Sequence, residues 1–208
     1  MEPIFHEGSY GYRPGRSAID TVRKARQRCW RYDSLPMGAS LHRTLVEGAS
    51  TDGGRQDRAA YGGNSQGGVV SPCLANLFLH YVFDMGMVRE FPDIPFERYA
   101  DDLICHCRSA EEARALWNAL EARFAACRLV LHSQKTKLVY CKDANRRGDY
   151  PIQSFDFLGY EFRPRSAVWH GSQLGVSFLP AASPRALKAI RQTVRRVDTP
   201  STERQDPG

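Results

Sequence analysis

The sequence contains no run of about 18 apolar residues, so no transmembrane helix is expected. Its first residues carry neither the basic stretch nor the apolar stretch of a secretory signal peptide. The six cysteines have no repeated spacing, which is typical of reduced thiols rather than of a disulfide framework. No internal repeat is evident. These absences predict a protein that works in the cytoplasm and has no membrane partner.

The chain is long enough for one sizeable domain. It has 208 residues, of which 42% are hydrophobic, so a substantial core can form. Lysine and arginine outnumber the acids, 29 against 23, which gives a formal net charge of +6 and a pI of about 9.1. This charge is compatible with a polyanionic partner such as nucleic acid.

Apolar residues at helical spacing predict four helices, over 17–30, 71–88, 109–127 and 183–197. Each begins at a serine that can cap it. The last helix carries basic residues and no acid among them: Arg185, Lys188, Arg191, Arg195 and Arg196. The second helix has one apolar stripe, the pattern with which a helix covers a core: Leu74, Leu77, Phe78, Tyr81, Met85 and Val88.

Short strands are predicted at 129–131, 138–140 and 155–162, the last with a central glycine that indicates a bulge or turn. Together with the helices, these strands predict an α+β fold. Between residues 33 and 65 neither a period of two nor one of 3.6 is sustained. The glycine-rich half of that stretch predicts an irregular, disordered tract.

The most informative feature is the acidic pair Asp101–Asp102. Apolar and β-prone residues precede it from Ile94 and follow it to Cys107, a pattern that predicts a strand–turn–strand hairpin. Two adjacent carboxylates on a tight turn are costly unless a cation neutralises them, and divalent cations such as Mg²⁺ are the usual partners. An ordinary polar turn is the alternative.

Cys105, His106 and Cys107 follow the acidic pair. Their spacing is too tight for a tetrahedral zinc site, so they predict core packing. In a strand the two cysteines share one face and His106 lies on the other.

Five segments in chain order resemble motifs of group II intron reverse transcriptases: Ser9–Ser17, Gln66–Pro72, Tyr99–Asp102, Leu131–Lys137 and Phe155–Tyr160. They are similar, in turn, to part of the fingers, the segment before the catalytic hairpin, the catalytic tetrad, the basic segment after it and the primer-grip strand pair. The chain resembles a truncated and internally deleted copy of such a reverse transcriptase/maturase.

The resemblance implies a right-hand polymerase fold with an antiparallel palm sheet. It implies an RNA-directed DNA polymerase, a nucleotidyltransferase of a mobile element, with two Mg²⁺ ions in a complete site. The implied partners are an RNA template, a DNA primer, dNTPs and the parent intron RNA. The implied division of the chain is partial fingers over 1–32, the irregular tract over 33–65, palm over 66–165, start of the thumb over 166–197 and a disordered tail over 198–208.

The resemblance also assigns roles to single residues. Asp101 would bridge both metal ions and Asp102 would support the site, which makes both of them catalytic and metal-binding residues. Gln66, Gly67 and Gly68 would form a bare backbone ledge against the nucleotide and template, where a Cβ would obstruct close approach. An ordinary turn before a helix is the alternative for these three.

Further roles concern nucleic-acid binding. Arg13, Arg16 and Lys135 would contact the template or the triphosphate, with solvated basic positions as the alternative. The primer end would be held by three residues, for which a plain core strand is the alternative: Phe157, Leu158 and Gly159. The basic helix from Ser183 would add phosphate affinity without sequence preference, with a solvated face as its alternative.

The sequence departs from the family in one respect. The family has a third metal-binding carboxylate on an earlier palm strand, which should lie between Tyr32 and Gln66. The candidate acids there are Asp33, Asp52 and Asp57, and none of them lies within a strand pattern. We therefore expect a deletion or frameshift there and little polymerase activity. The open interpretations are an active reverse transcriptase, of group II or retron type, a non-catalytic RNA-binding maturase remnant, and a pseudogene product that folds poorly.

Overall fold

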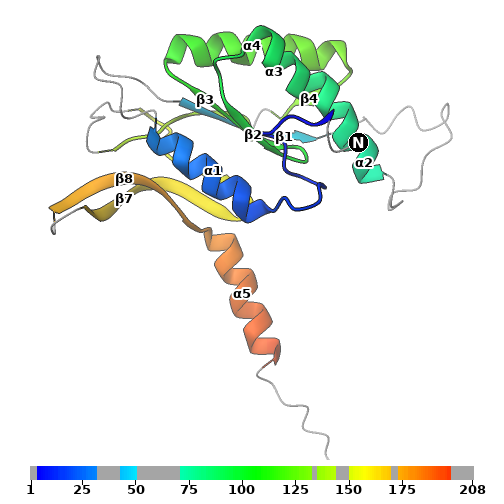
Figure 1. Cartoon of the computed structure of the whole chain (residues 1–208). Helices are drawn as coiled ribbons and strands as arrows, with labels where there is room; N and C mark the ends of the chain where they lie inside the picture. Colours follow the sequence, from blue (N-terminus) through cyan, green and yellow to red (C-terminus); the bar gives the residue numbers. More distant parts are fainter. Residues whose placement is uncertain are drawn as a thin grey trace, which may run out of the picture.

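The computed structural model describes residues 4–31, 43–50, 71–132, 135–143, 150–169 and 173–197. At its centre is an antiparallel sheet (Figure 1) in the order β2-β3-β1-β4, with β5 paired to β1 beside β4. Its strands are β1 (Arg43–Ser50), β2 (Phe96–Tyr99), β3 (Asp102–Cys107), β4 (Val130–Leu131) and β5 (Lys137–Tyr140). Strand β1 therefore lies inside the sheet, with neighbours along both edges.

Helices cover one face of this sheet, the upper face in Figure 1. They are α2 (Ser71–Leu79), the π-helical turn η2 (His80–Asp84), α3 (Met85–Glu90) and α4 (Ala110–Ala126). Their buried apolar residues pack against Leu103 and Cys105 of β3 in one core that includes Phe83 and Phe124. Each such side chain contributes roughly 2 kcal/mol by leaving water.

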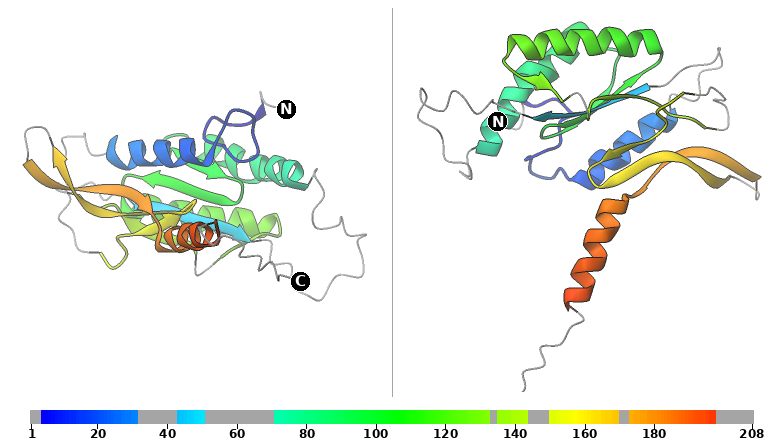
Figure 2. Two further views of the ribbon diagram at one scale, coloured as in Figure 1. Left: turned by 90° about the horizontal axis from the view of Figure 1, so that it is seen from below. Right: turned by 180° about the vertical axis from the view of Figure 1, so that it is seen from behind.

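The opposite face carries α1 (Ala18–Arg31) and a second antiparallel sheet of three strands (Figures 1 and 2). These strands are β6 (Phe155–Phe157), β7 (Tyr160–Trp169) and β8 (Gln173–Ala182). Val22, Ala25 and Cys29 of α1 join Ile104 of β3 and the phenylalanines of the second sheet in a separate core. Because β3 contributes to both cores, it is buried on both faces.

Helix α5 (Pro184–Val197) follows the second sheet and projects from the body of the molecule (Figure 2). Three of its apolar side chains are exposed to solvent: Leu187, Ile190 and Val194, at 39%, 55% and 52%. None of the helices in the described part of the chain is both long and apolar enough to span a bilayer.

Most of the predicted elements are confirmed. All four helices are present, and three have the expected serine caps, such as Ser109, whose hydroxyl accepts a hydrogen bond from the Glu112 amide at 3.1 Å. The 155–162 segment is a hairpin, because Leu158 and Gly159 both have positive φ and form its two-residue turn. The α+β class is confirmed.

The apolar stripe predicted for the second helix is wrong. Its members Leu74, Phe78 and Tyr81 are about half exposed, while Asn76 and His80 are buried. Leu74 and Phe78 precede the π-helical turn, so that turn does not explain their exposure. The buried side of these helices instead carries polar residues, because Asn76 and Asp84 bind the buried Arg98. A pattern of apolar residues alone therefore selects the wrong face.

The irregular tract predicted over 33–65 is wrong for residues 43–50, which form β1. The strand pairs with β3 on one side and with β4 and β5 on the other. Its own sequence has no alternating pattern that would predict a strand. The rest of that tract, and the tail over 198–208, lie outside the described residues. Strand β8 was not predicted, and β7 continues without a break across residue 165, where the expected palm ends.

The interpretation of Cys105 and Cys107 as packing residues is confirmed, since both are buried in the helix-covered core. His106 is buried on the other face, where its Nε2 lies 2.6 Å from the Glu97 carboxylate. Arg28 of α1 forms an ion pair of 2.7 Å with the same carboxylate. Two cations thus neutralise one buried acid.

His106 makes stability depend on pH. Burial opposes the charged ring, but the attraction of Glu97, with hydrogen bonds to the Cys29 thiol and Glu97, outweighs it and raises the pKa of His106 to about 9. A raised pKa stabilises the fold below the ordinary value of 6.5, and the contribution is lost as the pH rises through 9. We expect a loss on the order of 3 kcal/mol over that window, measured by urea unfolding. Below pH 6.5, His106→Gln should be less stable than the wild type, and its free energy of unfolding should not fall with pH in this way. The same pH dependence in the variant would contradict the assignment to His106.

Candidate active site

The acidic pair lies where β2 turns into β3. Tyr99 pairs with Asp102, so the turn consists of Ala100 and Asp101 alone. Ala100 has a φ of 55°, a left-handed conformation that a residue with a Cβ adopts only at a cost. Asp101 is exposed at the tip, and Asp102 is partly buried at the start of β3. The predicted hairpin is therefore present, with both carboxylates at its end.

Asp102 is electrostatically perturbed. Its partial burial and the charge of Asp101 disfavour ionisation, and Lys135 opposes them only in part, so the pKa of Asp102 rises to about 6. A carboxylate pair that resists ionisation is a site at which a cation would be favourable. The structure thus brings together three of the predicted site residues: Asp101, Asp102 and Lys135.

The described residues offer an incomplete set of metal ligands. Carboxylate oxygens are the ligands that Mg²⁺ prefers, and Asp101 and Asp102 fit one such cation. Within the described ranges no group of three or more His, Cys, Asp or Glu side chains could hold a metal ion. In β1 the residue paired with Asp102 is Gly48, which has no side chain, and the one acid of that strand, Glu47, is in register with Leu103.

The N-terminal segment lies against the hairpin. Ser9 forms a parallel bridge with Arg98, and the Tyr10 amide donates to the Arg98 carbonyl at 2.8 Å. Gly11 touches the turn itself, since a Cβ there would meet the Ala100 nitrogen at 2.3 Å. The predicted motif of Ser9–Ser17 is therefore a neighbour of the acidic turn, and only a glycine fits at residue 11.

The other predicted basic residues hold their own loop. Arg13 donates to the carbonyls of His6 and Ser9 at 2.8 and 2.7 Å, and its guanidinium lies over the Phe5 ring. Arg16 donates to the Glu7 carbonyl at 3.2 Å and lies over Tyr10. These contacts give both arginines a structural role, and their assignment to template binding stays a prediction.

The predicted primer-holding residues form a turn that is fixed to the start of α5. Phe157 is buried in the second core, as the core-strand alternative states. Leu158 and Gly159 are more accessible, and the Gly159 carbonyl accepts a hydrogen bond from the Ser183 amide at 2.9 Å. Gln66, Gly67 and Gly68 lie outside the described residues.

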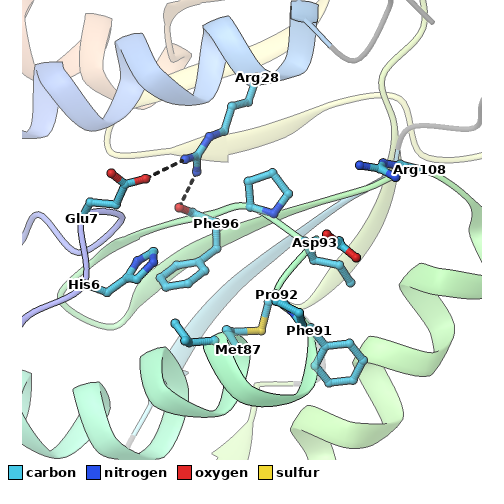
Figure 3. Close-up of a pocket in the computed structure, with 12 residues that line it drawn as sticks. His6, Glu7, Arg28, Met87, Phe91, Pro92, Asp93, Phe96 and Arg108 are labelled. Atoms are coloured by element: carbon cyan, nitrogen blue, oxygen red, sulfur yellow. Dashed lines mark hydrogen bonds and ion pairs between the residues drawn. The ribbon is translucent and has the colours of Figure 1, made fainter.

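One pocket lies at the opposite end of β2 from the acidic turn (Figure 3). It has a volume of about 350 Å³ and is lined by His6, Arg28, Phe91 and Arg108, among others. Arg28 reaches the Phe96 carbonyl at 2.6 Å, and the His6 ring stacks on Phe96. Burial lowers the pKa of His6. The pocket contains neither Asp101 nor Asp102, so it is separate from the acidic pair.

Sequence reasoning missed one set of residues at this site. Arg98 is buried directly before the turn and contacts Asn76, Asp84 and Ser9. The available signal was an arginine three residues before Asp101, in a strand whose other residues are Phe96, Glu97 and Tyr99, since a buried charge requires partners.

Comparison with known proteins gives one positive result. The family model described as reverse transcriptase (RNA-dependent DNA polymerase) matches residues 1–162, which is most of the chain. Comparison with curated proteins gives no match.

Removing the Asp102 charge should stabilise the protein at neutral pH. A folded-state pKa of about 6, above the ordinary 3.8, means that stability is lost as the pH rises through that window. Asp102→Asn should therefore gain about 1 kcal/mol at pH 8, allowing for solvent screening, and nothing at pH 3.5. Urea unfolding across this range measures the difference. The exposed Asp156→Asn is the control; an equal gain there would contradict the explanation.

Adding an acid opposite Asp102 should strengthen metal binding. Gly48→Asp places a third carboxylate at the residue paired with Asp102, and more carboxylate ligands tighten the binding of hard cations. We expect Mn²⁺ affinity, measured by electron paramagnetic resonance of the free ion, to rise about tenfold. The gain should vanish in Gly48→Asp/Asp102→Ala. An unchanged affinity would show that the strand pairing does not bring residue 48 to the cation.

Proposed function

Since the chain belongs to the reverse transcriptase (RNA-dependent DNA polymerase) family, we propose that it is an RNA-directed DNA polymerase of the group II intron type, with its reaction centre at Asp101 and Asp102. The observation that carries this proposal is the hairpin, which holds one carboxylate on its two-residue turn and the next at the start of β3. The substrates are an RNA template, a DNA primer and dNTPs, and the parent intron RNA is a further partner.

The group II subtype rests on two segments. The motif over 9–17 resembles that class and lies against the hairpin, and the run over 155–165 resembles the class more closely than a retron-type enzyme. A retron-type reverse transcriptase is the alternative. In this proposal the sheet and its helices are the palm, the N-terminal segment belongs to the fingers, and α5 begins the thumb.

The reaction transfers a nucleotidyl group to the primer 3′-hydroxyl and releases pyrophosphate. When bound, Mg²⁺ lowers the pKa of that hydroxyl and neutralises charge on the phosphates. The chain presents the carboxylate oxygens of Asp101 and Asp102, and Lys135 adds a positive charge beside them. The described residues fit one cation rather than two, so the activity of this copy depends on an acid outside them, such as Asp33, Asp52 or Asp57.

A second candidate function is RNA binding without catalysis. Helix α5 is exposed along its length and its charged residues are all basic: Arg185, Lys188, Arg191, Arg195 and Arg196. Such a face binds phosphates without sequence preference and with steep salt dependence. The exposed basic face of α5 is the observation that supports this candidate.

Primer extension tests the proposal. With an RNA template, DNA primer, dNTPs and Mg²⁺, we expect extension that falls to background in Asp101→Ala, because that substitution removes a cation ligand from the turn. Glu121→Ala, an exposed acid in α4, is the matched control and should retain the activity.

The same proteins distinguish the two functions. Salt-sensitive RNA binding that survives Asp101→Ala, without extension in any variant, would favour the RNA-binding remnant. Loss of both activities, together with a non-cooperative thermal transition, would identify a chain that does not fold to a working state.

A further inference from the structure

Arg98 is a fully buried arginine with every donor occupied. Its guanidinium donates five hydrogen bonds, the number of N–H groups that it has. Two of them go to the Asp84 carboxylate, each at 2.7 Å, in a bidentate pair. The others reach Asn76 Oδ1 at 2.6 Å, Ser9 Oγ at 2.9 Å and the Ala100 carbonyl at 3.1 Å.

The side-chain partners of Arg98 come from three segments beside the hairpin. Asn76 belongs to α2, Asp84 to η2 and Ser9 to the N-terminal segment, and all three are buried. His80 contacts the same Asp84 carboxylate at 3.2 Å. Because a buried ion pair gives little net stability compared with apolar residues of similar size, stability alone does not account for this arrangement.

The contact with Ala100 acts on the acidic turn directly. The Ala100 carbonyl and the Asp101 nitrogen belong to one planar peptide group. A hydrogen bond to that carbonyl oxygen therefore fixes the orientation of the peptide plane next to Asp101. The opposite side of Ala100 lies against the Gly11 backbone. Gly11 is itself held, since its carbonyl accepts from Asn76 Nδ2 at 3.0 Å. The network therefore holds the turn on both sides.

We propose that Arg98 is the positioning residue of the acidic turn, and that through it Asp84, Asn76 and the N-terminal segment set the direction of the Asp101 carboxylate. The left-handed Ala100 conformation is unfavourable by itself and persists because this network and the Gly11 backbone constrain it. The proposal rests on the proposed function for its catalytic consequence, although the conformation of the turn can be measured without activity.

The first experiment compares backbone dynamics of the full chain by nuclear magnetic resonance. In Arg98→Lys the charge stays, but the planar five-donor group is lost. We expect the amide order parameters of Ala100 and Asp101 to fall from a rigid value near 0.85 to below about 0.6. The control is Arg123→Lys, which removes an arginine that donates to the Tyr81 and Val82 carbonyls of η2. It should lower the melting temperature and leave the turn rigid.

The second experiment measures the consequence for the site. Arg98→Lys should weaken Mn²⁺ binding about tenfold, as loss of an outer-shell partner does, while Arg123→Lys should not. If primer extension is detected, kcat should fall with the KM for dNTP nearly unchanged. The double variant Asp84→Leu/Arg98→Met replaces the buried pair with apolar groups, so it guards against simple unfolding. It should fold and show the same loose turn.

The outcomes separate the two proposals. A rigid turn in folded Arg98→Lys and in the double variant would overturn the positioning role, whatever the activity. If the turn is already mobile in the wild type, and the wild type binds no Mn²⁺ at Asp101, the site is not preorganised. That result would also overturn the positioning role. A rigid wild-type turn that loosens in both variants, without Mn²⁺ binding in any protein, would support the positioning role and reject the proposed function.

Discussion

Burial of β3 on both faces is the constraint on which the rest of the structure depends. Leu103, Cys105 and Cys107 pack under the helices, while Ile104 and His106 pack under α1 and the second sheet. A strand covered on both faces cannot shift its register by one residue without moving each side chain to the wrong core. The register of the turn that precedes it, and with it the place of the acidic pair, is fixed by this packing.

The neighbouring strand β2 meets the same constraint with charged residues. Glu97 and Arg98 are adjacent and both fully buried, and strand geometry directs them to opposite faces. Glu97 is neutralised by Arg28 and His106, and Arg98 by Asp84. One ion pair therefore attaches α1 to the sheet, and the other attaches the helices and the N-terminal segment to the acidic turn.

The features predictable from sequence were those encoded locally. The hairpin at Asp101 follows from apolar residues around two acids, and the helix starts at Ser17 and Ser109 follow from their caps. The buried face of α2 could not be predicted from apolar residues, because the polar Asn76 lies on that face and binds Arg98 of β2. Strand β1 was missed since its pairing partners, not its own pattern, define it. The side-chain partners of Arg98 were missed because they are 14 to 89 residues distant in the chain.

Gly11 has a consequence for how this chain tolerates mutation over time. The atoms that exclude a Cβ there are the backbone of Ala100 and Tyr99, so no rotamer change can make room for a side chain. A chain whose hairpin still contributes to its function should resist every substitution at this position, whereas a chain released from selection should accumulate substitutions there as readily as on its surface. Natural variation at a single glycine codon would then record whether this gene is maintained or decaying.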